Sequence, residues 1–174
     1  MDLKSGYRRA MEALYLACIV VSGAALIVIT LIIPLGVFMR YVVNSPLSWP
    51  EPAAVLMMVM FSFLGGAAVY RAHVHIAVEA LVKAVNPKVR RVLNWAADAC
   101  MIAICLFMVG YGAQLARALW HQSIAEFPGL SVGLTYLPIP LGGLFTLLFI
   151  AERLWLGAPP ATSVMYRDGA TAVE

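Results

Sequence analysis

The sequence predicts an all-α integral membrane protein with four transmembrane helices. Of its 174 residues, 63% are hydrophobic and 12% are charged, and the mean hydropathy is +0.88. A soluble domain carries about 25% charged residues, so the composition argues against a water-soluble fold. Intrinsic disorder requires low hydrophobicity and high net charge, and this chain has neither.

Four stretches of the chain contain no Asp, Glu, Lys or Arg. They cover residues 13–39, 52–70, 99–116 and 127–151. A membrane-spanning helix needs about 20 apolar residues, and a helix satisfies its own backbone hydrogen bonds in lipid. We therefore predict one membrane domain, residues 1–158, with spans at 14–38, 52–70, 97–117 and 133–151. The first stretch is longer than the apolar core of a signal peptide, so we expect a permanent anchor.

The basic residues predict the orientation of these spans. If the N-terminus lies inside the cell, ten Lys and Arg fall on the inner side. Only Arg40 and Arg117 fall on the outer side. Basic residues concentrate in cytoplasmic loops, so we expect both termini in the cytoplasm. The basic residues are not clustered into the patch that nucleic-acid binding would require, and we predict no nucleic-acid partner.

Several helices should extend beyond their apolar cores. We expect the first to run from about Leu3 to Tyr41 with a kink at Pro34, and the third to run from Pro87 to about His121. About 35 residues make a helix of roughly 50 Å, which exceeds a bilayer core of about 30 Å. Long helices usually tilt.

The connections also carry signals. Ser48 and Glu51 have the spacing of a capping box at the start of the second helix, near Trp49. Residues 72–86 have an amphipathic pattern that predicts a helix lying in the membrane interface. Residues 159–174 are rich in Pro, Gly, Ser and Thr, and we expect a disordered cytoplasmic tail.

Buried chemistry is absent from the predicted spans. The ionisable residues lie near helix ends, so there is no central carboxylate for proton coupling. The three His residues lie near the interfaces and offer no facing pair of haem ligands. The three Cys residues lie in apolar helices, where packing is the simplest role. We find no catalytic or nucleotide-binding motif, and we predict no cofactor, no metal and no enzymatic activity.

Small residues four apart can bring helices close together. Ser62 and Gly66 have this spacing, as do Gly142 and Thr146. We favour packing among the four helices. A contact with another membrane subunit is the alternative.

An ordered string of residues runs from Arg40 to Val78. It comprises Arg40-Tyr41, Asn44, Pro46-Leu47, Trp49, Glu51, Phe63-Leu64-Gly65, Arg71, His75-Ile76 and Val78. This string resembles the small membrane subunit of tripartite ATP-independent periplasmic (TRAP) transporters. Pro140 and Gly142 also resemble the family's P-x-G near its fourth span. One departure is Pro52, which stands where the family usually has a second acid.

The resemblance implies a non-catalytic scaffold subunit. Its partners would be a large multi-span membrane subunit, which carries the substrate and sodium sites and moves as an elevator, and a periplasmic substrate-binding protein. The complex would lie in the bacterial inner membrane and take up organic acids with sodium. The alternative is a self-sufficient four-helix transporter or channel acting as a homo-oligomer. An enzyme or redox subunit is a third possibility.

The candidate contact residues are Arg40, Trp49, Glu51, Arg71 and His75. Arg40 would bind a partner or reach a lipid phosphate, and Glu51 most simply caps a helix. Arg71 and His75 would meet lipid headgroups or make a structural bond that anchors the interfacial helix. Arg90 and Arg91 are candidate contacts for anionic membrane lipids.

Overall fold

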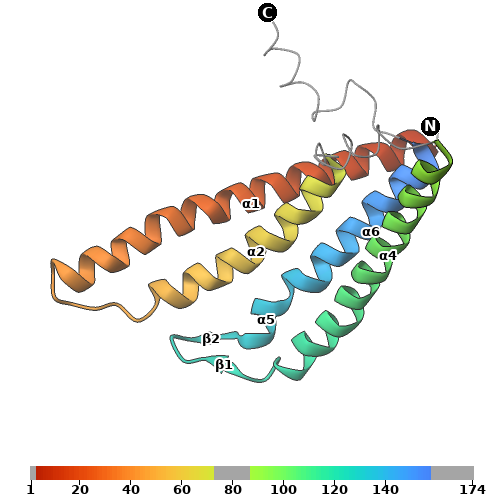
Figure 1. Cartoon of the computed structure of the whole chain (residues 1–174). Coiled ribbons are helices and arrows are strands. Elements are labelled where there is room, and N and C mark those ends of the chain that lie inside the picture. Colours follow the sequence, from red (N-terminus) through yellow and green to blue (C-terminus); the bar gives the residue numbers. More distant parts are fainter. Residues whose placement is uncertain (1–2, 73–86, 158–174) are drawn as a thin grey trace, which may run out of the picture.

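The computed structural model describes residues 3–72 and 87–157, and the structural statements below refer to these residues. Four long helices dominate the fold (Figure 1). They are α1 (Leu3–Tyr41), α2 (Pro50–Arg71), α4 (Pro87–Ala118) and α6 (Pro138–Leu156). Four candidate spans are long and apolar enough to cross a membrane, which confirms the predicted fold class. The predicted interfacial helix, apart from Ala72, and the predicted tail lie outside the described residues.

The helices form an open row rather than a closed bundle. Helix α2 packs against α1 and α6, and α6 packs against α2 and α4. Helices α1 and α4 therefore occupy the two ends of the row (Figure 1). Helix α4 is the most exposed, because only 6% of the residues in its most apolar 18-residue segment are buried. An open row leaves much of the apolar surface facing outward.

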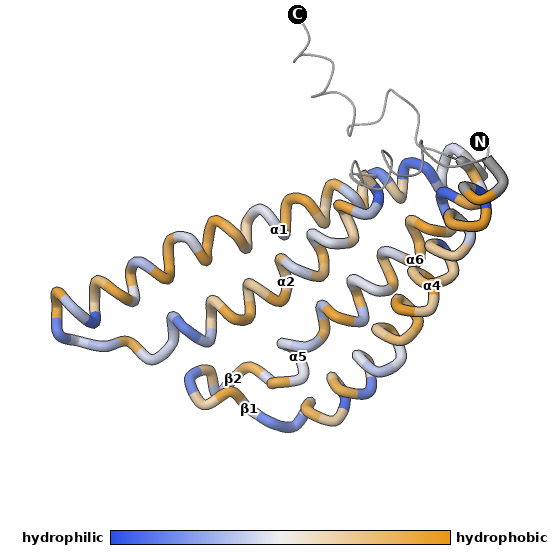
Figure 2. Tube along the Cα trace, in the orientation of Figure 1, coloured by the Kyte–Doolittle hydropathy of each residue, from blue (hydrophilic) through white to orange (hydrophobic). Residues whose placement is uncertain are grey.

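Polar segments gather at the two ends of the long helices, as the hydropathy colouring in Figure 2 shows. The exposed side chains between them include large apolar residues such as Leu31, Val92 and Phe107, which are 67%, 68% and 62% exposed. A water-soluble monomer rarely exposes large apolar patches, whereas the hydrocarbon core of a bilayer solvates them. The surface thus fits lipid or another membrane protein.

The buried core lies toward the N-terminal part of α1 and the C-terminal parts of α2 and α6, where Tyr15, Tyr70 and Ile150 belong to it. These parts of the helices lie on the side of the molecule where Figure 1 marks the N-terminus. All four long helices contribute to it, for example through Cys18, Ala67, Cys105 and Phe149. These four side chains are at most 2% exposed. The concentration of packing at one end makes that end the rigid part of the fold.

Glycines allow close helix approach at selected points. A Cβ atom added at Gly142 would lie 2.8 Å from the carbonyl oxygen of Phe63, so α6 touches the backbone of α2 there. A Cβ added at Gly66 would meet nothing within 4 Å, and Ser62 is exposed. Packing among the four helices therefore accounts for Gly142 but not for the Ser62–Gly66 pair.

The second helix starts near Trp49 as predicted, but its capping differs from the sequence-based expectation, and so does the start of the last span. Helix α2 begins at Pro50, its N-cap is Trp49, and no side chain caps it. The predicted Ser48–Glu51 capping box is therefore wrong, because Glu51 binds another residue, described below. The predicted span 133–151 is divided at Leu137 between the short helix α5 (Val132–Tyr136) and α6. Helix α1 runs without a break through Pro34.

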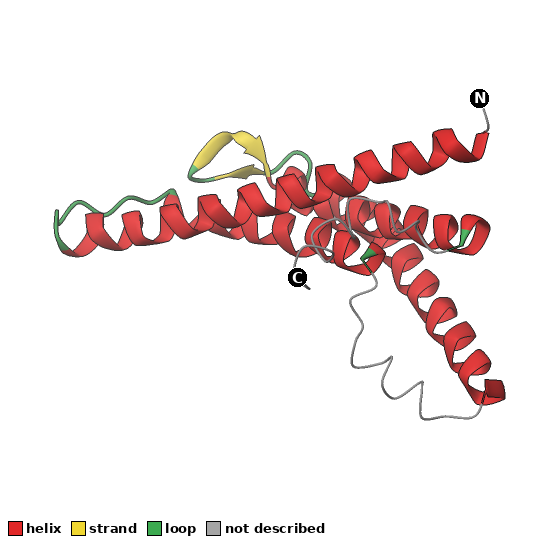
Figure 3. Ribbon diagram, turned by 90° about the horizontal axis from the view of Figure 1, so that it is seen from above, coloured by secondary structure: helices red, strands yellow, loops and turns green. Residues whose placement is uncertain are grey.

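The connection between α4 and α5 contains a small hairpin that the sequence analysis missed. Its strands are β1 (Ser123–Ile124) and β2 (Phe127–Ser131), and they pair antiparallel. They are the strands drawn in Figure 3, beside the long helices. Ser131 ends the hairpin and caps α5, because its hydroxyl accepts a hydrogen bond from the Gly133 amide at 3.0 Å.

Candidate functional site

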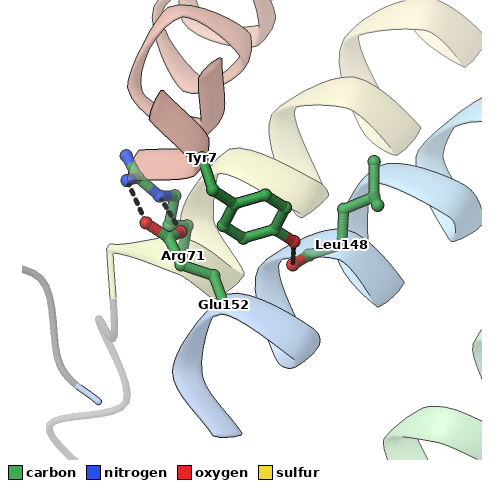
Figure 4. Close-up of polar contacts among 4 residues, drawn as sticks. All are labelled: Tyr7, Arg71, Leu148 and Glu152. Atoms are coloured by element: carbon green, nitrogen blue, oxygen red, sulfur yellow. Dashed lines mark hydrogen bonds and ion pairs between the residues drawn. The ribbon is translucent and has the colours of Figure 1, made fainter. Parts of the chain in front are cut away.

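A buried ion pair joins the end of α2 to α6. The Nε of Arg71 donates a hydrogen bond to Oε2 of Glu152 at 2.8 Å, and its Nη2 donates one to Oε1 at 2.9 Å (Figure 4). Arg71 is 4% exposed and Glu152 is 5% exposed. Two parallel charge-assisted bonds of this kind are strong and geometrically specific. The pair therefore fixes both the separation and the register of α2 and α6.

Aromatic rings surround the guanidinium group of Arg71. Its central carbon lies 5.2 Å from the ring centroid of Tyr15 on α1 and 5.4 Å from that of Phe149 on α6. Cation–π contacts of this length are favourable, more so when they are shielded from water. One arginine side chain thus contacts α1 and α6 while belonging to α2.

Further polar contacts tie α1 to α6. The Tyr7 hydroxyl donates a hydrogen bond to the backbone carbonyl of Leu148 at 3.3 Å (Figure 4). The Arg8 guanidinium donates one to the carbonyl of Leu156 at 3.1 Å. Both acceptors lie on α6, so the N-terminal part of α1 is held against it.

A second ion pair joins α6 to α4. It links Arg153 and Asp98, whose side chains are 29% and 25% exposed. The Arg153 guanidinium also lies over the ring of Tyr70, at 5.7 Å from the centroid. We call the Arg71–Glu152 and Arg153–Asp98 pairs together the paired cluster. It links three neighbouring helices of the row, α2, α6 and α4.

A third ion pair connects the C-terminal end of α1 to the N-terminal end of α2, at the opposite end of these helices from the paired cluster. The Nη2 of Arg40 donates a hydrogen bond to Oε1 of Glu51 at 3.0 Å, and the side chains are 49% and 76% exposed. Both residues line a groove between the two helices. Trp49, the N-cap of α2, is partly buried nearby in the chain.

The structure thus brings two of the predicted site residues together, Arg40 and Glu51. Arg71 is buried and lies elsewhere, so the expectation that it meets lipid headgroups is wrong. The alternative of a structural bond describes it better, although the bond reaches Glu152 on α6. His75 and the side chain of Arg90 lie outside the described residues. Arg91 is exposed on the first turns of α4.

Sequence reasoning missed Glu152 and Asp98 as partners. A usable signal was present. In an up-and-down arrangement of four spans, the end of the second, the start of the third and the end of the fourth meet at the same side of the membrane. Arg71, Asp98, Glu152 and Arg153 occupy those positions. Two acids and two bases at one level predict ion pairs.

The polar groups of the described residues serve to hold helices together. No three His, Cys, Asp or Glu side chains lie close enough in this part of the chain to bind a metal ion. The paired cluster fixes α2, α4 and α6, and the Arg40–Glu51 pair joins α1 to α2. These features define a small multi-pass membrane protein with a rigid end and broad apolar faces.

Comparison with known proteins gives the class a family. The family described as "Tripartite ATP-independent periplasmic transporters, DctQ component" matches residues 29–159. The chain is also 27% identical over 143 residues to a Haemophilus influenzae protein named "Putative TRAP transporter small permease protein". That alignment covers 82% of this chain and 86% of the relative. The chain belongs to the DctQ-component family and is a TRAP transporter small subunit. Membership implies association, in general, with a large membrane subunit and a binding protein.

Proposed function

We propose that this subunit is a non-catalytic scaffold in a sodium-driven uptake transporter for organic acids. It would hold a large elevator-type membrane subunit in the bilayer and contribute to docking of the periplasmic binding protein. The protein would lie in a bacterial inner membrane with both termini in the cytoplasm, and residues 1–158 would form its single membrane domain. The observation that carries the proposal is the open row of helices, which is fixed at one side by one buried and one partly buried ion pair.

A scaffold must resist movement while its partner moves. The paired cluster supplies this resistance, because a buried bidentate pair permits few alternative arrangements. The open row supplies the contact surface, because α1 and α4 expose apolar side chains that a membrane partner can cover. Helices associate in lipid through close packing rather than through the hydrophobic effect.

The charge distribution supports a role without ion transport of its own. In the described residues, the charged side chains lie near helix ends. A transporter that binds sodium or protons at mid-membrane usually places polar or ionisable groups there. The substrate and sodium sites would therefore belong to the large subunit.

The proposed contact residues are Arg40, Trp49 and Glu51, which lie where α1 ends at Tyr41 and α2 begins at Pro50. We expect Arg40→Ala and Glu51→Ala to lower uptake in the reconstituted complex by weakening assembly or docking. The number of sodium ions moved per substrate should stay the same. Arg117→Ala is the matched control, because Arg117 is an exposed arginine near the end of α4 with no such partner among the described residues. A changed stoichiometry in either variant would place the residue in the ion path and contradict the scaffold proposal.

Affinity purification from the native membrane in mild detergent tests the partnership directly. We expect the tagged chain to bring down one multi-span membrane protein in stoichiometric amount. A pure homo-oligomer that transports solutes in liposomes by itself would contradict the proposal and favour the self-sufficient transporter. A bound chromophore would favour a redox subunit instead.

A further inference from the structure

The groove beside the Arg40–Glu51 pair has two chemically distinct parts. Its walls are apolar and come from both helices and from the connection between them. They include Ile33 and Val37 of α1, Leu47 of the connection and Pro50 of α2. Arg40 and Glu51 also line the groove, and their charged groups form the ion pair described above.

The position of the two parts matches the layers of a membrane. Helix α1 ends at Tyr41, so Arg40 lies at the level where a spanning helix leaves the hydrocarbon. Ile33 precedes it by seven residues, which corresponds to about 10 Å along a helix axis. Ile33 and Val37 therefore lie at the depth of lipid acyl chains, whereas Leu47 and Pro50 lie near the ion pair at the depth of headgroups.

The ion pair retains capacity to bind further groups. A single hydrogen bond joins Arg40 to Glu51, whereas a guanidinium group carries five N–H donors and a carboxylate has about four acceptor sites. Both side chains are at least 49% exposed. An incoming group can thus contact a positive and a negative side chain about 3 Å apart.

We propose that this groove binds a phospholipid with an ethanolamine headgroup. The lipid phosphate accepts hydrogen bonds from Arg40, and the lipid ammonium donates hydrogen bonds to Glu51. An acyl chain packs against Ile33 and Val37. Neighbouring opposite charges complement a headgroup that carries both charges. A glycerol headgroup offers Glu51 no cation, and a choline headgroup offers it no N–H donor.

Native mass spectrometry of the purified full-length chain tests this proposal. The protein is titrated with ethanolamine, choline and glycerol phospholipids that have identical acyl chains. We expect the ethanolamine lipid to bind more tightly than the other two by a factor between about 1.4 and 5, the range that an exposed charge pair supports. Because the partners are absent, this measurement does not depend on the proposed scaffold function.

Three variants assign the contacts. Glu51→Gln should reduce ethanolamine lipid binding to the level of the choline lipid. Arg40→Gln should weaken binding of all three lipids, and Val37→Trp should do so by filling the groove. Arg117→Gln is the control and should bind lipids like the wild type. Equal binding of the three lipids by the wild type, or tightest binding of the glycerol lipid, would overturn the proposal. So would Glu51→Gln and Arg40→Gln variants that match the control.

Discussion

Loss of the Glu152 carboxylate should destabilise the fold more than loss of any exposed carboxylate. In Glu152→Leu, Arg71 would stay in a site where it is 4% exposed and would lose two hydrogen bonds of 2.8 and 2.9 Å. Breaking a buried ion pair by removing one partner costs about 3–5 kcal/mol. The same change at Glu51, where the pair is largely exposed, should cost about 0–1 kcal/mol.

The double variant Arg71→Met/Glu152→Leu separates the pair from the packing around it. Replacing a buried pair with apolar side chains of similar volume is often close to neutral. We therefore expect the double variant to be more stable than Glu152→Leu alone. The cost of Glu152→Leu then reflects a buried Arg71 charge that has lost its two bonds to Glu152, rather than the loss of a net favourable contact.

Two buried thiols provide the assay. Cys18 and Cys105 are each 2% exposed, so a thiol-reactive fluorophore should label them only after unfolding. Cys100 is exposed and is replaced by Ser in every variant to remove background labelling. The free energy of unfolding is measured in mixed micelles with increasing sodium dodecyl sulfate. Equal costs for Glu152→Leu and Glu51→Leu would refute this reasoning, as would additive losses in the double variant.

Three further changes have expected outcomes in the same unfolding assay. Gly142→Val should cost about 1–3 kcal/mol by overpacking against Phe63, and Gly66→Val, which enters open space, should cost less than half as much. Ser131→Ala removes the cap of α5 and should cost about 0.5–2 kcal/mol, with faster amide hydrogen exchange confined to α5. Asp98→Leu should rank between Glu152→Leu and Glu51→Leu, because its pair has intermediate exposure; any other rank would argue against burial as the deciding variable.

The sequence predicted the spanning helices well, because a bilayer imposes a length and an apolar composition that can be read without tertiary information. The sequence also predicted that the first and third helices extend beyond their apolar cores, starting at Leu3 and Pro87. The end of the second was marked by Arg71. These features depend on neighbouring residues, which is why periodicity and charge reveal them.

Features that depend on distant residues were harder to predict. Arg71 and Glu152 are separated by 81 positions, and each alone resembles an interfacial charge. Glu51 does not form the predicted local capping box, because its carboxylate accepts a hydrogen bond from Arg40 instead. Arg40 lies close to Glu51 only because the α1–α2 connection reverses the direction of the chain. The break at Leu137 lies in the charge-free stretch 127–151, where composition does not distinguish a long span from a folded connection. The hairpin before it has strands of only two and five residues, too short to give a clear alternating pattern.

The distance in sequence between Arg71 and Glu152 also sets an order of events during synthesis. At about 5–20 residues per second, the ribosome makes the intervening 81 residues in about 4–16 s. Throughout that interval the Arg71 guanidinium lacks the two hydrogen bonds that it donates to Glu152 in the finished fold, and burying a charge without its full set of bonds is costly. We infer that Arg71 stays at the membrane surface, and that the end of α2 reaches its final position only after α6 has been inserted. Ribosome-arrested chains ending before and after Glu152 test this inference, because a cysteine in the variant Ala72→Cys, beside an intact Arg71, should react with a water-soluble reagent in the shorter chain only. Equal reactivity in the two would show that α2 reaches its final position without α6.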